Sequence, residues 1–513
     1  MKNTWSTLIS ISLAFGLVSA TATATADTHD PVYQVAFEQL LQSGQLDLIS
    51  ETDDTKAEPD TSIDTDTNSF AHGPWSYPPA CTSKLDSLGS ELCVYTNISF
   101  ARGRGISLFT TPRIAEQIAE LAPFHDHDND HDNDHDRDHS KANKANEANK
   151  IPNTNIPPVR HEVNEFQVTW YTRSTTNKGM GMFAKKDLRR GDLITAYTPV
   201  LIAYSENTLL PSEREKFLQL AINQLPEPTR ESYLRLATVY GDPRIVVQDI
   251  ASANTFGVLF PGTVGSRKKK KNTAAADAES AATEDAASPP PPHPLPQHLA
   301  VIPEPSRINH ACNPNAQFQI DTTQLIHRVY AVRPIGRNEE ITIAYTNPLD
   351  NYATRQRYLK QFFGFTCACA RCSIERQRRE DAPDAAIAEI NALQAILADW
   401  TATSDSDSDL DSSGIVTGIG SGSVPGNRIK LAERLIKVYL DEGLHGYLDP
   451  AYCHAALAYS AAGSLRGVQK YLDLAIEAIR LRLGPDAPDL VAWEEMRRDP
   501  TRHWSWRWSK RKK

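Results

Sequence analysis

The chain has 513 residues, a formal net charge of −10 and 40% hydrophobic residues. This length allows two or three folded cores, but the acidic runs 51–66, 126–139 and 405–411 place much of the charge in tails and inserts. Nothing in this distribution indicates direct nucleic-acid recognition. The first apolar stretch, residues 8–18, is too short for a membrane span.

Residues 1–26 have the three parts of a secretory signal peptide. Lys2 gives a positive start, the apolar stretch follows, and small residues up to Ala26 offer cleavage points. The lysine-rich run 267–271 is a competing signal, because it resembles a nuclear address. The order of the three parts favours the secretory pathway, with nucleus or cytoplasm as the alternative.

Residues 27–123 predict a small, partly disordered module. Short strands or turns are expected at 93–96 and 103–109, and a helix from Pro112 to Leu121. In an oxidising compartment Cys81 and Cys93 would form a disulfide, although two reduced thiols explain the sequence equally well. Asn97, in Asn-Ile-Ser, would then be a glycosylation acceptor.

A His/Asp-rich low-complexity linker, residues 124–160, separates this module from a segment with strand and helix patterns. The apolar spacing there predicts strands at 166–170, 181–185, 192–203, 316–320, 325–331 and 340–344, and helices at 213–220, 228–236, 245–256 and 352–362. Beyond residue 374 the pattern is helical, with helices at 382–400, 428–442, 450–462 and 465–483. The alternating tryptophans 504, 506 and 508 predict a C-terminal packing strand or tail.

Three cysteines, Cys367, Cys369 and Cys372, lie within six positions. Thiolates so crowded cannot easily bond to one another, and a fourth, Cys312, comes from a distant loop about 55 residues earlier. Four sulfur ligands make the closed tetrahedral site of one structural zinc ion. Free thiols in a loop are the less favoured interpretation at this spacing.

Four ordered blocks surround these cysteines: Asn-Lys-Gly-Met-Gly-Met-Phe-Ala at 177–184, Asn-Thr-Phe at 254–256, Asn-His at 309–310 and Ile-Gly-Arg-Asn-Glu-Glu-Ile-Thr-Ile-Ala-Tyr at 335–345. Together with the cysteines they resemble the SET domain of protein lysine methyltransferases. The resemblance is strongest to the SET and MYND branch, which includes many fungal SET proteins. The cysteine-rich MYND finger is absent from this chain.

The resemblance implies an α+β fold, in which a β-rich SET domain with a helical insert is followed by a post-SET zinc site and an α-helical C-terminal region. The corresponding boundaries are a SET domain at 161–346 with a low-complexity insert at 265–297, a post-SET segment at 347–374, and a helical region at 375–513 with a disordered linker at 403–426.

The resemblance also implies S-adenosylmethionine as cofactor and Tyr345 as the catalytic residue that orients the amine. The residues expected to bind the cofactor are Lys178, Gly179, Met180, Gly181, Asn254, Asn309, His310 and Phe365. Taken singly, these residues have simpler explanations: a hairpin turn for the glycines, a core residue for His310 and an ordinary strand residue for Tyr345.

The predicted function is methylation of a lysine on a histone or non-histone protein, by a chain that is expected to be a monomer. Two alternatives remain: an inactive SET-fold binding protein, or a secreted interaction protein with a vestigial SET core. Three positions depart from the family pattern, namely Ala311, Asn338 and Phe363. Phe363 stands where relatives often have tyrosine, which removes a hydroxyl and bears on the number of methyl groups transferred.

Overall fold

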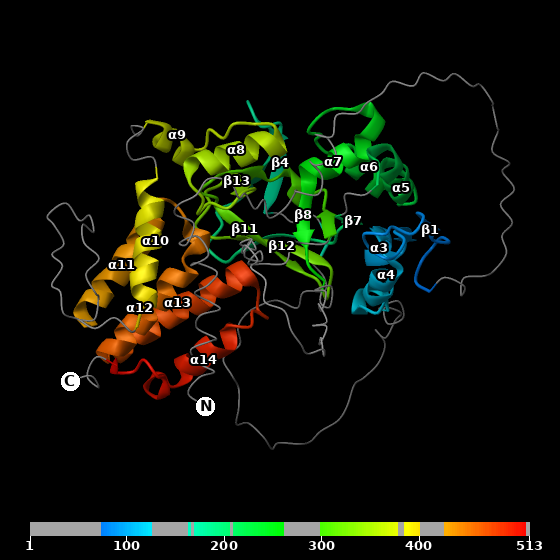
Figure 1. Cartoon of the computed structure of the whole chain (residues 1–513). Helices are drawn as coiled ribbons and strands as arrows, with labels where there is room; N and C mark the ends of the chain where they lie inside the picture. Colours follow the sequence, from blue (N-terminus) through cyan, green and yellow to red (C-terminus); the bar gives the residue numbers. More distant parts are fainter. Residues whose placement is uncertain are drawn as a thin grey trace, which may run out of the picture.

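The computed structural model describes residues 73–125, 163–165, 169–205, 209–260, 298–377, 384–400 and 425–508. The predicted signal peptide, the two low-complexity segments and the linker at 403–426 fall mainly or wholly outside these residues. Figure 1 shows a central group of strands with the C-terminal helices on one side and the N-terminal segment on the other. The α+β fold class is therefore confirmed.

The largest sheet joins the N-terminal segment to the central strands. β3 pairs in parallel with β7, with Ser107 opposite Leu201. The other neighbouring strands of this sheet are antiparallel. Together the pairs form one sheet that extends from the N-terminal module to the strand after residue 254. Its order is β1 (Ala80–Cys81), β2 (Cys93–Asn97), β3 (Ile106–Thr110), β7 (Leu201–Tyr204), β9 (His298–Val301) and β8 (Thr255–Val258).

Two smaller sheets complete the central layer, and one apolar core spans all three sheets. The first runs β10 (Asn309–His310), β13 (Glu340–Ile343), β5 (Met180–Ala184) and β4 (Trp170–Ser174). The second runs β11 (Ala316–Asp321), β12 (Ile326–Ala331) and β6 (Leu193–Tyr197). Fully buried Leu108, Ile194, Val329 and Ile341 show that each sheet contributes to that core.

Helices of the first half pack beside the large sheet. Proline opens α4 and α5, where its missing N–H leaves no helical hydrogen bond unmade. Apolar side chains of α5 and α7 form a second core with the sheet, around fully buried Tyr233. These helices are α3 (Phe100–Gly103), α4 (Pro112–Ala119), α5 (Pro211–Asn223), α6 (Glu227–Leu234) and α7 (Val246–Asn254).

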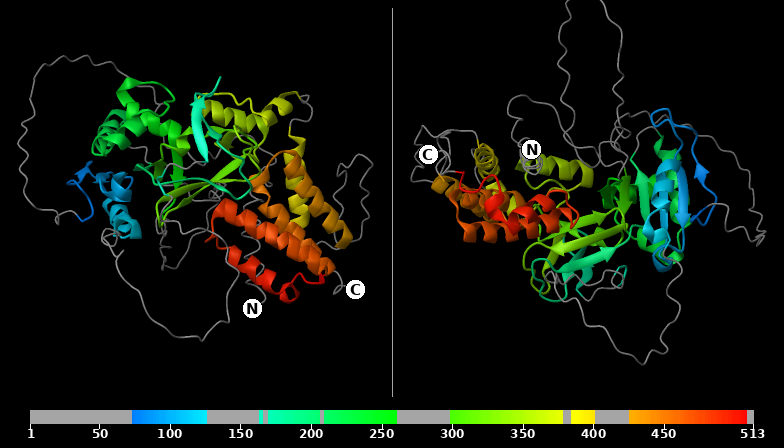
Figure 2. Two further views of the ribbon diagram at one scale, coloured as in Figure 1. Left: turned by 180° about the vertical axis from the view of Figure 1, so that it is seen from behind. Right: turned by 90° about the horizontal axis from the view of Figure 1, so that it is seen from below.

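After residue 351 the described elements are helices, and those from residue 385 onward share a core of their own (Figure 2). Asn351 caps α8 by accepting a hydrogen bond from Thr354 N, and Gly364 ends it in the left-handed conformation. Gly463 and the cap Ser464 divide α12 from α13 in the same way. The helices are α8 (Tyr352–Phe363), α9 (Ala370–Gln377), α10 (Ala385–Ala398), α11 (Pro425–Asp441), α12 (Asp449–Ala462), α13 (Leu465–Leu483) and α14 (Leu490–Arg498). Among the described helices, none combines the length and apolarity needed to cross a membrane.

Several predicted boundaries were wrong. The strand expected at 192–203 is two strands, β6 and β7, because Pro199 lacks the N–H that a ladder needs. The helix expected at 245–256 ends at Asn254, where β8 begins. Helices α9 and α14 were not predicted. The tryptophans near the C-terminus lie mainly in turns, and Trp504 and Trp506 pack on the helical core, so the strand prediction there was wrong.

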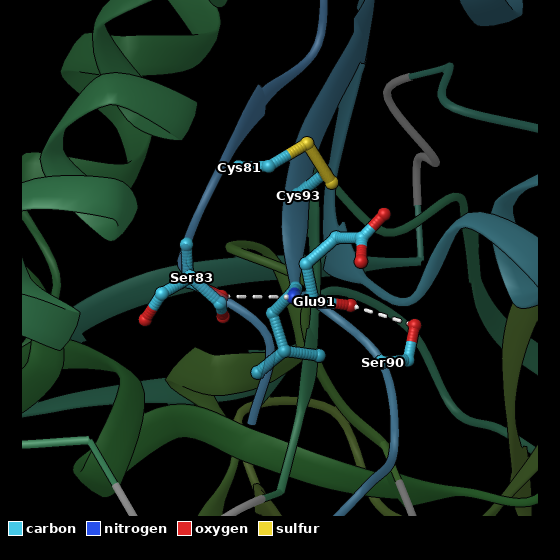
Figure 3. Close-up of a disulfide and its surroundings, with 7 residues drawn as sticks. Cys81, Ser83, Ser90, Glu91 and Cys93 are labelled. Carbon is cyan, nitrogen blue, oxygen red and sulfur yellow. Dashed lines mark hydrogen bonds between the residues drawn. A yellow bond between two sulfur atoms is a disulfide. The ribbon is translucent and has the colours of Figure 1, made fainter. Parts of the chain in front are cut away.

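The structure addresses the two open questions about the N-terminal module. Cys81 and Cys93 form a disulfide across the paired strands β1 and β2 (Figure 3). The glycosylation prediction for Asn97 stays a prediction that this structure does not favour, because the residue is 4% exposed and its side chain is hydrogen-bonded. Its Nδ2 donates to Pro74 O, and its Oδ1 accepts from Ser99 N and Phe100 N.

Candidate functional site

The four predicted metal-ligating cysteines meet beside strand β10. Cys312 follows β10, Cys367 and Cys369 lie between α8 and α9, and Cys372 lies in α9. All four sulfur atoms lie within 4.8 Å of one another. Only Cys369 is half-buried, while the other three are buried. We call these four residues the sulfur cluster, and they could hold a metal ion.

Hydrogen bonds among the four thiols shift their pKa values in different directions. The bond with Cys367 is the main reason why the pKa of the Cys312 thiol is raised. The bond with Cys312 is the main reason why the pKa of Cys369 is lowered. Because thiolates need a counter-charge at such short separations, a divalent cation suits this donor set and would replace the shared protons.

His310 joins the sulfur cluster to Tyr345. The backbone N–H of Tyr345 donates to Nδ1 of His310 over 2.9 Å. Since Nδ1 accepts, the ring proton belongs on Nε2, which lies 3.3 Å from Cys312 Sγ. This neutral tautomer therefore donates to the sulfur, and His310 is fixed at both ring nitrogens.

Tyr345 follows β13 and has its hydroxyl anchored. The hydroxyl donates to the backbone carbonyl of Ile308 over 2.7 Å. Burial, and secondarily the charge of Glu340, raises the pKa of the phenol above its ordinary value. The hydroxyl consequently remains protonated at neutral pH. Its ring centroid lies 4.8 Å from that of Phe363.

A pocket of about 720 Å³ opens beside Tyr345. One wall comes from the strands and α8 and includes Phe256, Tyr345 and Phe363. Tyr447 and Arg482, from the helical layer, also line the pocket. Aromatic rings thus surround a space at the junction of the central strands with the C-terminal helices.

The carboxylate of Glu340 gathers two predicted cofactor ligands. Its Oε1 accepts from Asn309 Nδ2 over 2.9 Å, and its Oε2 accepts from Lys178 Nζ over 2.8 Å. Gly181 lies against the same group, because a Cβ there would be 2.9 Å from Asn309 Nδ2. A glycine is therefore needed at position 181 so that the backbone can lie close to the Asn309 side chain, and not only to form a turn.

The remaining predicted ligands are more dispersed. Asn254 lines the pocket, but both N–H groups of its amide go to backbone carbonyls, those of Ala237 and Ile250. Met180 is 41% exposed, and Gly179 has φ +68°, with nothing near its missing side chain. Phe365 lies beside the sulfur cluster, with its ring 6.1 Å from that of His310.

Sequence reasoning missed two groups at this site. Glu340 lies in the motif at 335–345, but the sequence analysis assigned it no role. The acidic pair Glu339 and Glu340 in that motif was a signal that could have identified it. Tyr447 and Arg482 come from helical segments far along the chain, and nothing in their local sequence marks them as pocket residues.

Comparison with known proteins places these features in a family. The SET domain family model matches residues 179–346. The histone-lysine N-methyltransferase SET5 of Vanderwaltozyma polyspora is 42% identical over 77 residues, which cover 15% of each chain. The histone-lysine N-methyltransferase ASHR1 of Arabidopsis thaliana is 40% identical over 78 residues, covering 15% of this chain and 16% of the relative. The matches thus span only a small part of these relatives.

The family match contains β5, the sequence Asn309–His310, Glu340 and Tyr345. Hydrogen bonds join Asn309 to Glu340 and His310 to Tyr345, and Tyr345 lines the pocket. Cys312 of the cluster lies within the matched residues, and the other three cysteines lie beyond their end at residue 346. Residues 179–346 of this chain are therefore similar to the SET domain family.

Proposed function

We propose that this chain is a protein lysine N-methyltransferase that uses S-adenosylmethionine. The observation that carries the proposal is the placement of Tyr345, whose hydroxyl is hydrogen-bonded, protonated and beside an aromatic pocket. SET methyltransferases use this cofactor, and the printed names of the relatives describe histone-lysine methylation. The activity of the whole chain is nevertheless a proposal, because the matches cover a small part of each relative.

The residues present fit the cofactor. Gly181 leaves the strand without a side chain where a Cβ would collide with Asn309, so the main chain lies close to that amide. Exposed Met180 and the open Gly179 leave neighbouring backbone accessible. When bound, S-adenosylmethionine supplies the methyl group. The residues that would hold it are Lys178, Gly179, Met180, Gly181, Asn254, Asn309, His310 and Phe365. Of these, Asn254 and His310 already have their side-chain N–H groups or ring nitrogens bonded within the chain.

The chain's own contribution would be alignment and exclusion of water. Methyl transfer to an amine needs an unprotonated nitrogen, and desolvation in a protein pocket lowers the pKa of a lysine ammonium. Tyr345, as the catalytic residue, would hold the nitrogen at an orientation set by its own bond to Ile308 O. Phe363 packs on the Tyr345 ring and restricts its movement.

The sulfur cluster would hold one structural zinc ion. Four cysteine ligands fill a tetrahedral site, so no position remains for water or substrate. The zinc would instead fix His310 through Cys312, and through His310 the backbone of Tyr345. We also propose the domain boundaries inferred from the sequence, a monomer, and the SET and MYND branch without its finger.

The decisive experiment is methyl transfer from labelled S-adenosylmethionine to a panel of histones and other proteins by the zinc-loaded full chain. We expect a labelled lysine, and loss of labelling in Tyr345→Phe, which keeps the ring and removes the hydroxyl. Tyr171→Phe is the matched control, since its exposed hydroxyl bonds only Asn338 Oδ1 over 3.2 Å. Equal activity in Tyr345→Phe and the wild type would contradict the catalytic role.

Cofactor binding separates the enzyme from a binding protein. Calorimetry of the zinc-loaded chain should show S-adenosylmethionine binding. Binding without turnover on any protein would favour an inactive SET-fold protein. Absence of binding would end the methyltransferase proposal.

We further propose that the chain enters the secretory pathway. The disulfide Cys81–Cys93 supports this location, because such bonds persist mainly in oxidising compartments. The histone substrates in the relatives' names support the nucleus instead. Mass spectrometry of the native protein distinguishes the two: cleavage near Ala26 and an intact disulfide are expected, and an uncleaved, fully reduced chain would contradict the proposal.

A further inference from the structure

A buried arginine lies between two ligands of the sulfur cluster. Arg371, in α9, is 3% exposed although its guanidinium is always charged. Its NH1 donates to the backbone carbonyls of Cys312, over 3.3 Å, and Pro348, over 2.6 Å. Its Nε lies 2.9 Å from a carboxylate oxygen of Glu442, just after α11. One side chain therefore connects the Cys312 loop, the post-SET helix and the C-terminal helical layer.

A second arginine completes a closed network. Arg355, in α8, is 0% exposed and bonds Glu375 and the carbonyl of Asp350. Glu375 also lies 3.3 Å from Arg371 Nε. Two positive and two negative side chains thus balance in the interior. Removing one member of such a group leaves an unpaired buried charge, which costs stability. The four side chains are therefore expected to stay together in the folded chain.

The segment that begins at Glu442 leads to the pocket. Gly443 packs on the loop after Cys312, since a Cβ there would be 3.1 Å from Asn313 Cβ. Gly446 packs on β11, since a Cβ there would be 2.7 Å from Gln317 Oε1. The next residue, Tyr447, lines the pocket, as Tyr345 does. We call residues 442–447 the wall segment.

We propose that Arg371 and Glu442 couple metal binding at the sulfur cluster to the position of the wall segment, so that loss of the metal opens the pocket. This inference rests on the proposed function, because it concerns control of the same pocket. Both residues are positioning residues, since neither is a cysteine ligand and neither lines the pocket.

The physical basis is the shared carbonyl of Cys312. A bound cation would fix Cys312 against Cys369 and Cys372, and thereby fix the carbonyl that Arg371 NH1 contacts. Without the cation, hydrogen bonds connect Cys312 to the post-SET segment: Cys372 Sγ donates to Cys312 Sγ, Cys312 N donates to Cys369 Sγ, and Arg371 NH1 donates to Cys312 O. Arg371 NH1 would then donate to the carbonyl of a Cys312 loop that is held less firmly. Coupling is reciprocal, so weakening the bond to Glu442 must also weaken metal binding.

The test is Glu442→Gln in the full, zinc-loaded chain. This variant removes the carboxylate charge but leaves Arg371 paired with Glu375 and the two carbonyls. We expect zinc to pass to a chromophoric chelator about 10-fold faster than in the wild type, the lower end of the effect of residues that orient metal ligands. Amide hydrogen exchange of the wall segment should rise in the variant, and in the wild type after chelation.

Glu389→Gln is the matched control. Glu389 pairs with Arg434 at 2.6 Å between α10 and α11, so the same substitution breaks an interhelical ion pair away from the cluster. This control should release zinc at the wild-type rate. Wild-type zinc release and wild-type exchange in Glu442→Gln would overturn the proposal, and so would a chain that binds no zinc.

Arg371→Lys and Arg371→Met separate coupling from folding. Lysine retains the charge but not the forked geometry, so it should restore part of the zinc retention that methionine loses. If Arg371→Met does not fold, Glu442→Gln still decides. Zinc release and exchange require no methyl transfer, so they test the coupling even if the methyltransferase proposal fails. In an active chain, KM for the protein substrate should rise more than kcat falls.

Discussion

The backbone N–H of Tyr345 donates to Nδ1 of His310, and this 2.9 Å bond fixes which nitrogen of the ring faces the sulfur cluster. Nε2 then lies 3.3 Å from Cys312 Sγ. A single imidazole thus links the tyrosine at the pocket with a cysteine of the cluster. The resemblance assigned His310 to the cofactor, whereas its observed bonds are to the chain itself.

His310→Ala should therefore damage two properties together. Loss of the bond to Tyr345 N lets the phenol shift, and a displacement of about 1 Å lowers activity by about 100-fold. Loss of the bond to Cys312 should speed zinc release by about 10-fold. Methyl transfer and chelator competition on the same preparation measure both. Wild-type zinc retention with weakened cofactor binding would instead mean that His310 acts on the cofactor alone.

Glu340→Gln tests the carboxylate that holds Lys178 and Asn309. A glutamine has one acceptor oxygen, so it can satisfy only one of the two donors. We expect the cofactor Kd, measured by calorimetry, to rise about 10-fold, as for the loss of one charge-assisted hydrogen bond. The control is Glu231→Gln, which disrupts an exposed pair with Arg235 at 2.7 Å. Equal Kd values for Glu340→Gln and wild type would contradict this role.

Phe363→Tyr tests the departure from the family pattern. The Phe363 ring lies 4.8 Å from the Tyr345 ring and lines the pocket, so an added hydroxyl would narrow the space beside the reacting amine. We expect the products to shift toward monomethyl-lysine, measured by mass spectrometry of the modified protein. Phe217→Tyr, on α5 and outside the pocket lining, is the comparison. An unchanged product distribution would show that this ring does not limit methyl number.

At this site, whether the sequence could predict a contact depended on how far apart the two residues lie in the chain. Cys367, Cys369 and Cys372 were predictable because their crowding is local and their chemistry specific. The contact of Arg371 with Glu442 was not predictable, since 71 residues separate the two and Glu442 belongs to an ordinary helical pattern. In the fold, most strands and helices followed from apolar spacing, whereas Pro199 divided a strand whose residues favoured continuity.

His327 makes the stability of the fold dependent on pH. It is 0% exposed on β12, with its ring 4.4 Å from that of Phe256 and 5.1 Å from that of Phe318. Burial lowers the pKa of His327 from 6.5 to about 3. Between these values the unfolded chain binds a proton that the folded chain does not. Stability therefore falls as the pH drops from about 6.5 toward 3.

His327→Phe should remove this dependence. At pH 5 the histidine reduces the free energy of unfolding by about 2 kcal/mol, that is 1.5 pH units at about 1.4 kcal/mol each. Urea unfolding at pH 8 and pH 5 should show that the variant loses less stability than the wild type by this amount. The control is Tyr330→Phe on the same strand, because the pKa of Tyr330 is raised by burial and its phenol does not titrate in this range. Equal losses in His327→Phe and wild type would mean that His327 is protonated in the folded state, or shielded to the same extent in the unfolded chain.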